Sequence, residues 1–223
     1  MTFRILFFLT FSMLFFTVLS SGQKSDLGNW FIYFGNQQIN KKWNWWTEAQ
    51  YRSYNFASDT EQILLRTAAG YNITPDDNIQ LGYAFIHSRP YVTGSDEKTK
   101  NNEHRIYQQF IHKHSIGRLF VQHRYRFEER FLKDDFKIRF RYFLSLNIPF
   151  NRKVLEQNAF YLSGYNEIFL QTHTQVFDRN RLYGGLGYVL NQNIRLETGI
   201  MYQLYETSYR PQWQVICIGN LVL

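Results

Sequence analysis

The chain has 223 residues, a formal net charge of +7, 19% aromatic residues and a single cysteine. One cysteine excludes an intramolecular disulfide, and beyond the N-terminal region no apolar stretch reaches roughly 18 residues, which excludes a membrane protein built from helices. The basic excess is mostly arginine interspersed with glutamate rather than clustered lysine, so we expect no nucleic-acid partner.

The N-terminal segment has the pattern of an export signal. Arg4 supplies a positive charge, Ile5–Leu19 is mostly apolar, and Ser-Ser-Gly follows. The alternative is a retained membrane anchor, but the apolar run is shorter than the roughly 20 residues that a spanning helix needs. We predict a cleaved signal peptide over residues 1–22 and a single domain over residues 23–223.

The rest of the chain divides into eleven strand-like segments, most of them 9 to 13 residues long. Strands of soluble proteins usually have about 5–6 residues, whereas tilted membrane strands need about 9–11. The lengths therefore favour a membrane barrel over a soluble sandwich. In chain order the segments are Asn29–Ile39, Trp43–Tyr54, Ile63–Asn72, Asn78–His87, Glu103–His112, Arg118–Arg130, Lys137–Pro149, Ala159–Leu170, Arg179–Tyr188, Asn193–Tyr205 and Gln212–Leu223.

Charged and apolar residues alternate along several of these segments. In LFVQHRYRFEER, which starts at Leu119, Arg124, Arg126 and Glu128 share one face of the strand, while Tyr125 and Phe127 share the other. Segments 159–170 and 212–223 alternate less cleanly, and the sequence leaves their facing open. The pattern predicts an all-β fold, an antiparallel up-and-down transmembrane β-barrel of about 10–12 strands with a polar lumen.

The connections set the expected orientation. Short turns are predicted at Asn40–Lys42, Ile73–Asp77, Ser115–Gly117 and Val189–Gln192, and mostly longer loops at Asn55–Gln62, Ser88–Asn102, Phe131–Phe136 and Gln171–Asp178. Outer-membrane barrels keep short turns in the periplasm and long loops outside. Bacterial barrels also have even strand numbers, so eleven segments imply either a strand that the pattern misses or a first segment that is not an ordinary member of the barrel.

Several sequence blocks resemble an uncharacterised bacterial family, domain of unknown function 2490. The blocks are HRYRFEER (His123–Arg130), RFRYFLSLNIP (Arg139–Pro149), YNEIF (Tyr165–Phe169), FDRNRLYGGLGY (Phe177–Tyr188) and the opening Leu27-Gly28-Asn29-Trp30 with Tyr33. The resemblance implies an exported, barrel-like protein of the Gram-negative envelope and no known activity. The final Leu223 departs from the terminal Phe common in outer-membrane strands.

Sixteen charged residues are predicted to face the lumen, and arginines outnumber glutamates among them. Arginine forms bidentate pairs with carboxylates, so one interpretation is a structural ion-pair network that fills a narrow barrel. The other is a positive conduit or binding site that favours anions. The residues are Glu48, Arg52, Arg66, Glu103, Arg105, Arg124, Arg126, Glu128, Arg130, Arg139, Arg141, Glu167, Arg179, Arg181, Arg195 and Glu197.

Other residues invite weaker hypotheses. His112 and His114 share a strand face, but two ligands without a third do not make a metal site. The GGLG run at 184–187 lacks the helix that a phosphate cradle needs, and we expect these glycines either to permit strong curvature of the strand or to let a large neighbouring side chain lie against them. The aromatics Trp30, Trp43, Trp45, Trp46 and Tyr54 fit interfacial girdles, with a sugar-stacking platform as the alternative. The candidates for protease or hydrolase chemistry are His87, His104, His112, His114, His123, His173, Asp134, Asp135 and Asp178, and they show no recognisable spacing.

The sequence therefore predicts an outer-membrane barrel that acts as a narrow channel or a solute-binding passage, in contact with outer-membrane lipid and small anionic solutes. One alternative is a structural or interaction barrel, closed by its Arg–Glu network, that binds through its loops. A third is an outer-membrane lipid or peptide hydrolase, and a soluble periplasmic barrel is the alternative location. No cofactor and no metal are predicted.

Overall fold

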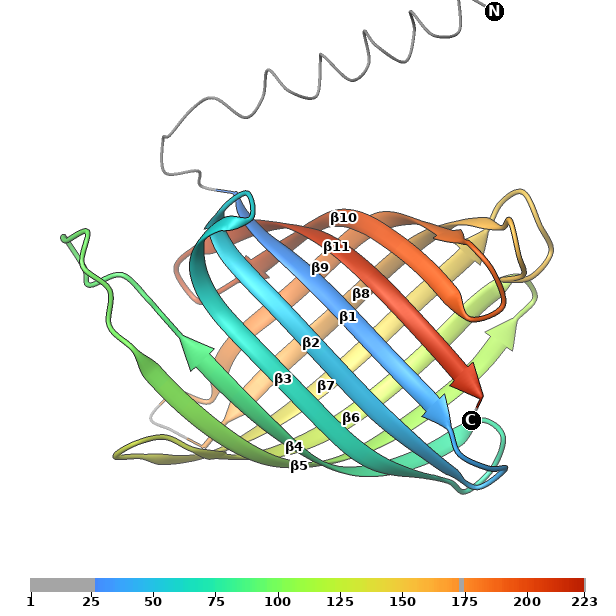
Figure 1. Cartoon of the computed structure of the whole chain (residues 1–223), viewed down its shortest axis with the longest axis horizontal. Coiled ribbons are helices and arrows are strands. Elements are labelled where there is room, and N and C mark those ends of the chain that lie inside the picture. Colours follow the sequence, from blue (N-terminus) through green and yellow to red (C-terminus); the bar gives the residue numbers. More distant parts are fainter. Residues whose placement is uncertain (1–26, 173–174, 223) are drawn as a thin grey trace, which may run out of the picture.

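The computed structural model describes residues 27–172 and 175–222, and these form one closed β-barrel (Figure 1). The predicted signal peptide lies outside the described residues. The strands are β1 (Gly28–Gln38), β2 (Trp43–Asn55), β3 (Ser58–Asn72), β4 (Asp77–Ser88), β5 (Asn101–Ile116), β6 (Leu119–Phe131), β7 (Phe136–Pro149), β8 (Phe160–Gln171), β9 (Phe177–Val189), β10 (Ile194–Leu204) and β11 (Tyr209–Val222).

The barrel closes through a parallel pair, β1 with β11, whereas every other neighbouring pair is antiparallel. The prediction of an all-β barrel of about 10–12 strands is confirmed at eleven, and the prediction of a purely antiparallel barrel is wrong at this pair. The reason is arithmetic. Ten successive antiparallel steps turn the last strand into the same direction as the first, so an odd barrel can close only in parallel. The expected missing strand is not needed, and β1 is an ordinary member of the wall.

Alternation along the strands separates a lumen face from an outer face. In β6, Arg126 and Glu128 are buried, whereas the intervening Tyr125 and Phe127 are exposed. The facing that the sequence left open is settled for β8, where Tyr161 and Phe169 are buried in the lumen, on the same face as Glu167.

The middle of the seam between β1 and β11 departs from this alternation, because it is apolar on both faces, whereas Gln212 and Gln214 keep amides on the lumen face near the start of β11. Trp30 and Ile32 of β1 and Ile216 of β11 are buried on the lumen side, where they belong to one apolar cluster. Tyr33 of β1 lies on the outer face. Two apolar faces give no period-2 signal, which explains why the polarity of the last segment alternates poorly in the sequence.

The connections depart from the predicted alternation of short and long. β2 and β3 are joined by Phe56 and Ala57 alone, with Ala57 at a φ of 52°, so the predicted longer loop at Asn55–Gln62 is wrong. Residues 89–100 do form a long connection at that end of the barrel. A second long connection, residues 150–159, lies at the other end, among the tight turns. The orientation across a membrane stays a prediction.

The long loop folds back onto the barrel wall. Tyr91 donates a hydrogen bond of 2.6 Å to Asp59, and Lys98 forms an ion pair with the same carboxylate. The Lys98 ammonium also lies over the rings of Tyr54 and Tyr91, at 4.9 and 4.6 Å from their centroids. Within residues 27–172 and 175–222, no helix is long and apolar enough to span a membrane.

Candidate functional site: the charged lumen

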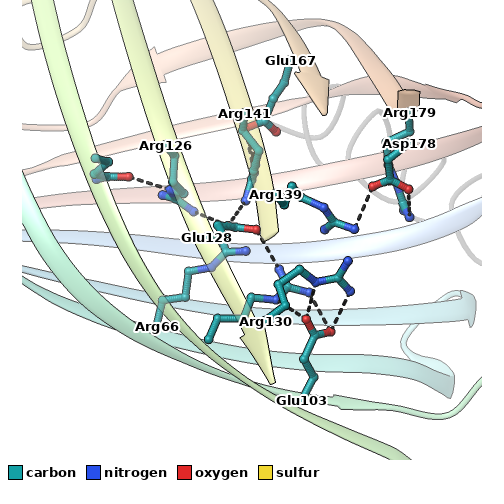
Figure 2. Close-up of polar contacts among 12 residues, drawn as sticks. Arg66, Glu103, Arg126, Glu128, Arg130, Arg139, Arg141, Glu167, Asp178 and Arg179 are labelled. Atoms are coloured by element: carbon teal, nitrogen blue, oxygen red, sulfur yellow. Dashed lines mark hydrogen bonds and ion pairs between the residues drawn. The ribbon is translucent and has the colours of Figure 1, made fainter. Parts of the chain in front are cut away.

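The lumen charges meet at Glu128, the carboxylate at the centre of Figure 2, which has no exposed surface. Arg141 Nη1 lies 2.6 Å from Glu128 Oε1, Arg126 Nη1 lies 3.5 Å from the same oxygen, and Arg105 Nη1 lies 3.4 Å from Oε2. The four side chains come from β5, β6 and β7, because alternate residues of adjacent strands face the same side of the wall.

A second carboxylate, Glu167 of β8, extends the network to the next strand of the wall. Arg141 Nη2 and Arg124 Nη2 each lie 2.7 Å from Glu167 Oε1, and Arg181 lies 3.7 Å from Oε2. Arg141 therefore bridges Glu128 and Glu167 through its two terminal nitrogens. A planar guanidinium suits this role because its donors point in fixed directions.

Three further acids hold the remaining ion pairs. Glu103 accepts hydrogen bonds from Arg105, at 2.7 Å, and from Arg130. Asp178 pairs with Arg139 at 2.8 Å and with Arg179 at 3.1 Å (Figure 2). On the other side of the lumen, Glu48 pairs with Arg66 at 2.7 Å. The sequence placed Asp178 among the candidates for protease or hydrolase chemistry, and the structure makes it an acid of the network.

Aromatic rings and amides also contact the arginines, which outnumber the acids of the network. The predicted set holds eleven arginines against five glutamates. Arg139, Arg141 and Arg181 all lie over the buried Phe169 ring, at 5.8, 4.5 and 4.6 Å from its centroid. Each cation over an aromatic face is attracted by the ring quadrupole.

Amides and further rings do the same for the other arginines. Arg52 donates to Gln50 and Gln62 and lies 3.6 Å from the Trp30 ring centroid. Arg126 donates to Gln109 at 2.7 Å. The predicted lumen set contains none of these neutral partners, although period-2 spacing from the charged residues could have found them.

Two predicted residues stay outside this group of ion pairs, amides and rings. Glu197 accepts hydrogen bonds from Tyr161 at 2.8 Å and Ser163 at 3.0 Å rather than pairing with an arginine. Arg195 has no carboxylate of the described residues within ion-pair distance, and its Nε is buried without a hydrogen-bond partner in the protein. The structure thus brings fourteen of the sixteen residues into one contiguous group of ion pairs, amides and rings, and sets these two apart.

The network fills one half of the lumen and leaves the other half open. A cavity of about 330 Å³ lies toward the end with the tight turns, since Pro75 and Asp76 of the β3–β4 connection line it. Glu48, Arg124 and Glu167 form its floor. The arrangement therefore combines a charged plug with a blind cavity.

The histidine candidates do not assemble in the lumen. His87, His104, His112 and His123 alternate with lumen-facing residues, and their partners are Asn102, Tyr83, Asp77 and Tyr142 on neighbouring strands. His112, His114 and His123 stack on one another, with centroids 5.2 to 6.1 Å apart. No group of metal-ligating residues occurs in the described part of the chain. Asp134 and Asp135 lie in the β6–β7 turn, and His173 lies outside the described residues.

Two of the tryptophans predicted for an interfacial girdle face the lumen instead, and the girdle itself stays a prediction. Trp43 and Trp45 are exposed on the outer face. Trp30 and Trp46 point the other way and line the cavity, because they share the parity of the lumen residues of β1 and β2.

Comparison with known proteins gives a family and nothing finer. No curated protein and no solved structure matches the chain. A family model described as "Protein of unknown function (DUF2490)" matches residues 27–214, nearly all of the barrel, in agreement with the resemblance carried by the sequence blocks. The chain therefore belongs to the DUF2490 family, whose function is unknown.

Proposed function

We propose that this protein is an outer-membrane barrel that does not conduct, and that its blind cavity binds a solute. One observation carries the proposal: the network around Glu128 is buried, with no exposed surface on Glu128 and only 1% on Arg126, and it reaches the facing wall, where Arg181 and Arg52 both lie over the Trp30 ring. A filled lumen of this kind is expected for a barrel well below the 16–18 strands of porins. The geometry thus favours closure by the Arg–Glu network over the channel interpretation.

The outer face supports insertion into a membrane. Large apolar side chains are exposed on the wall, such as Leu65 (50%), Leu81 (60%), Leu162 (53%), Leu182 (53%) and Leu186 (56%). Monomeric soluble proteins rarely expose contiguous apolar surface on this scale. A band of apolar residues around a polar interior is the pattern of an outer-membrane barrel.

Aromatic pairs near the strand ends add to this support. Trp43 packs against Tyr71 with ring centroids 5.0 Å apart, at the end with the tight turns. Phe131 packs against Phe136 at 5.2 Å, at the opposite end. Aromatic residues at both rims are expected where a barrel meets the two lipid headgroup layers.

Planar-bilayer recording tests closure. The barrel would be extracted folded from the outer membrane, its folding verified by its altered gel mobility on heating, and recorded at high protein density. We expect no discrete conductance steps. Steps with anion preference would overturn the closed lumen and restore the channel interpretation.

Fractionation tests the location separately. We expect the protein in the outer-membrane pellet, released only by detergent, because burying the apolar wall in lipid stabilises the inserted state. Recovery from the periplasmic fraction without detergent would overturn membrane insertion and leave a soluble barrel.

A further inference from the structure

The lining of the cavity, in addition to its volume, indicates which kind of ligand fits. At about 330 Å³ it lies at the small end of the range of roughly 300–1,000 Å³ that is usual for ligand sites. Its mouth opens at the end where β1 meets β2 and β3 meets β4, and its floor is the charged plug. With the lumen closed by the plug as proposed, a ligand enters from this end.

Two cations line the cavity without forming an ion pair to any described residue, although Asp76 and Glu197 also line it. Lys113 lies near the C-terminal end of β5, and Arg195 is the second residue of β10. Both therefore lie toward the mouth of the cavity. No carboxylate among the described residues forms an ion pair with either side chain. The two side chains also lie close enough for their like charges to repel. An anion between them would remove that repulsion.

The unpartnered polar atoms of the cavity are mainly donors. Among the described lining residues, six buried nitrogens have no hydrogen-bond partner in the protein, against two buried oxygens. Gln214 has no exposed surface, yet its Nε2 is one of these nitrogens. Such a wall is matched by a ligand that brings acceptors. The nitrogens belong to Trp30, Trp46, Arg66, Arg124, Arg195 and Gln214, and the oxygens to Glu48 and Asn147.

One wall of the same cavity is apolar. Trp30, Ile32 and Phe34 of β1 and Ile216 and Ile218 of β11 line it from the parallel seam. In most other strands the corresponding lumen positions carry charges or amides. Apolar surface that faces an aqueous lumen is unfavourable unless something apolar covers it. Trp30, Ile32 and Ile216 are already buried, so Phe34 and Ile218 supply the apolar surface that a small inorganic anion would leave uncovered.

We propose that the cavity binds an anionic amphiphile, a molecule with a carboxylate head and a medium-length hydrocarbon chain. The carboxylate lies between Lys113 and Arg195 near the mouth, and the chain lies along the seam wall toward Trp30. The inference deepens the proposed function, because it assumes the blind cavity above the plug. It names a chemical class for the solute and requires no reaction.

Native mass spectrometry of the folded barrel, released from non-ionic detergent, tests the ligand class with three probes. Decanoate carries both features, decanol lacks the charge, and acetate lacks the chain. We expect one decanoate per barrel and much weaker retention of decanol and acetate. Equal binding of decanol would overturn the role of the cations, and equal binding of acetate would overturn the role of the wall.

Variants locate the site. The double variant Lys113→Gln/Arg195→Gln should weaken decanoate binding by about tenfold or more, as expected for lost hydrogen bonds to a charged group. The matched control is Lys41→Gln/Lys153→Gln, which removes two charges from connections at the same end of the barrel but outside the cavity lining. Ile218→Thr should weaken decanoate binding severalfold and leave acetate unchanged.

The two proposals fail differently. A barrel that is folded and silent in bilayers but binds no decanoate would overturn this inference and leave the closed lumen standing. A barrel that conducts and still binds decanoate through Lys113 and Arg195 would overturn the closed lumen and keep the ligand class.

Discussion

The carboxylate of Glu128 has no contact with solvent and forms ion pairs with Arg105, Arg126 and Arg141. A buried ion pair is weak evidence for stability in itself, because removing charges from water costs several kcal/mol per ion. Removing only one partner is a different matter, since the guanidinium groups that remain stay buried without their counter-charge. Neutralising Glu128 alone should therefore destabilise the barrel more than replacing the whole network by apolar residues would.

We expect Glu128→Gln to lower the free energy of unfolding by about 3–5 kcal/mol, the usual cost of breaking a buried charge network from one side. The measurement is urea-induced unfolding in lipid vesicles, followed by tryptophan fluorescence. Glu129→Gln is the matched control, because its side chain lies on the opposite face of β6. An unchanged midpoint for Glu128→Gln would mean that the arginines find other partners.

The glycines of β9 provide a second test at single positions. Gly187 lies under the ring of the buried Tyr161, so an added methyl group would overlap that ring, whereas nothing lies within 4 Å of one at Gly184. This agrees with the expectation that these glycines admit large side chains. Gly187→Ala should cost about 1–3 kcal/mol of stability through overpacking. Gly184→Ala should leave the unfolding midpoint near that of the wild type, and equal losses in both variants would contradict the argument.

Among the elements, the β1–β11 pair is the one that most directly tests the fold. In its parallel register Tyr33 lies opposite Cys217, the only cysteine of the chain. We expect Tyr33→Cys to form an intramolecular disulfide with Cys217 under mild oxidation, detected by gel mobility without reductant. Phe31→Cys is the control, because it lies on the same face two residues out of register. Efficient cross-linking of the control alone would mean that β1 and β11 pair in a register shifted by two residues.

The contact between the loop at residues 89–100 and the barrel wall should depend on pH. The hydrogen bond that Tyr91 donates to Asp59 raises the pKa of the phenol from near 10 to about 12. Because the folded pKa is raised, this contact is complete below pH 10 and is lost as the pH rises through about 12. Difference absorbance between the wild type and Tyr91→Phe should show tyrosinate appearing near pH 12. In an Asp59→Asn background the same difference should appear nearer pH 10, and a transition that does not move would exclude the carboxylate as the cause.

On the scale of the whole molecule, closure of the lumen can be reversed by removing charges of both signs together. The triple variant Arg126→Ala/Glu128→Ala/Arg141→Ala leaves little unpaired buried charge from Glu128 and shortens three side chains in the plug. We expect conductance steps in bilayers where the wild type is silent. The control Glu61→Ala/Arg210→Ala removes an ion pair of 2.6 Å near the start of β11, outside the plug, and should stay silent. A folded triple variant that is also silent would place the closure elsewhere.

The sequence predicts the strands well and their closure poorly, for a physical reason. Alternation and strand length are local, so eleven segments and the lumen face of β6 are visible in the sequence. The parallel seam depends on how the first and last strands meet, and no local pattern encodes it. The expectation of an even number of strands argued against the correct count of eleven.

The same limit applies to the site. Which residues face the lumen follows from parity, but which of them pair depends on register and on strands that are not adjacent in sequence, as in the contact of Arg124 with Glu167. Lys113 was not singled out, because a lone lysine at a strand end normally faces solvent, and it is indeed exposed. That it lines the same cavity as Arg195 becomes visible only when the wall is closed.

The parallel seam also has a consequence for labelling. β1 begins and β11 ends at opposite ends of the barrel (Figure 1). In an even-stranded barrel both of these points share one compartment. Here, in a bilayer, a membrane-impermeant reagent added from one side would reach a reporter at the start of β1 or one at the end of β11, but not both. A single pair of reporters would therefore read out the orientation of the barrel and its odd strand number in one experiment.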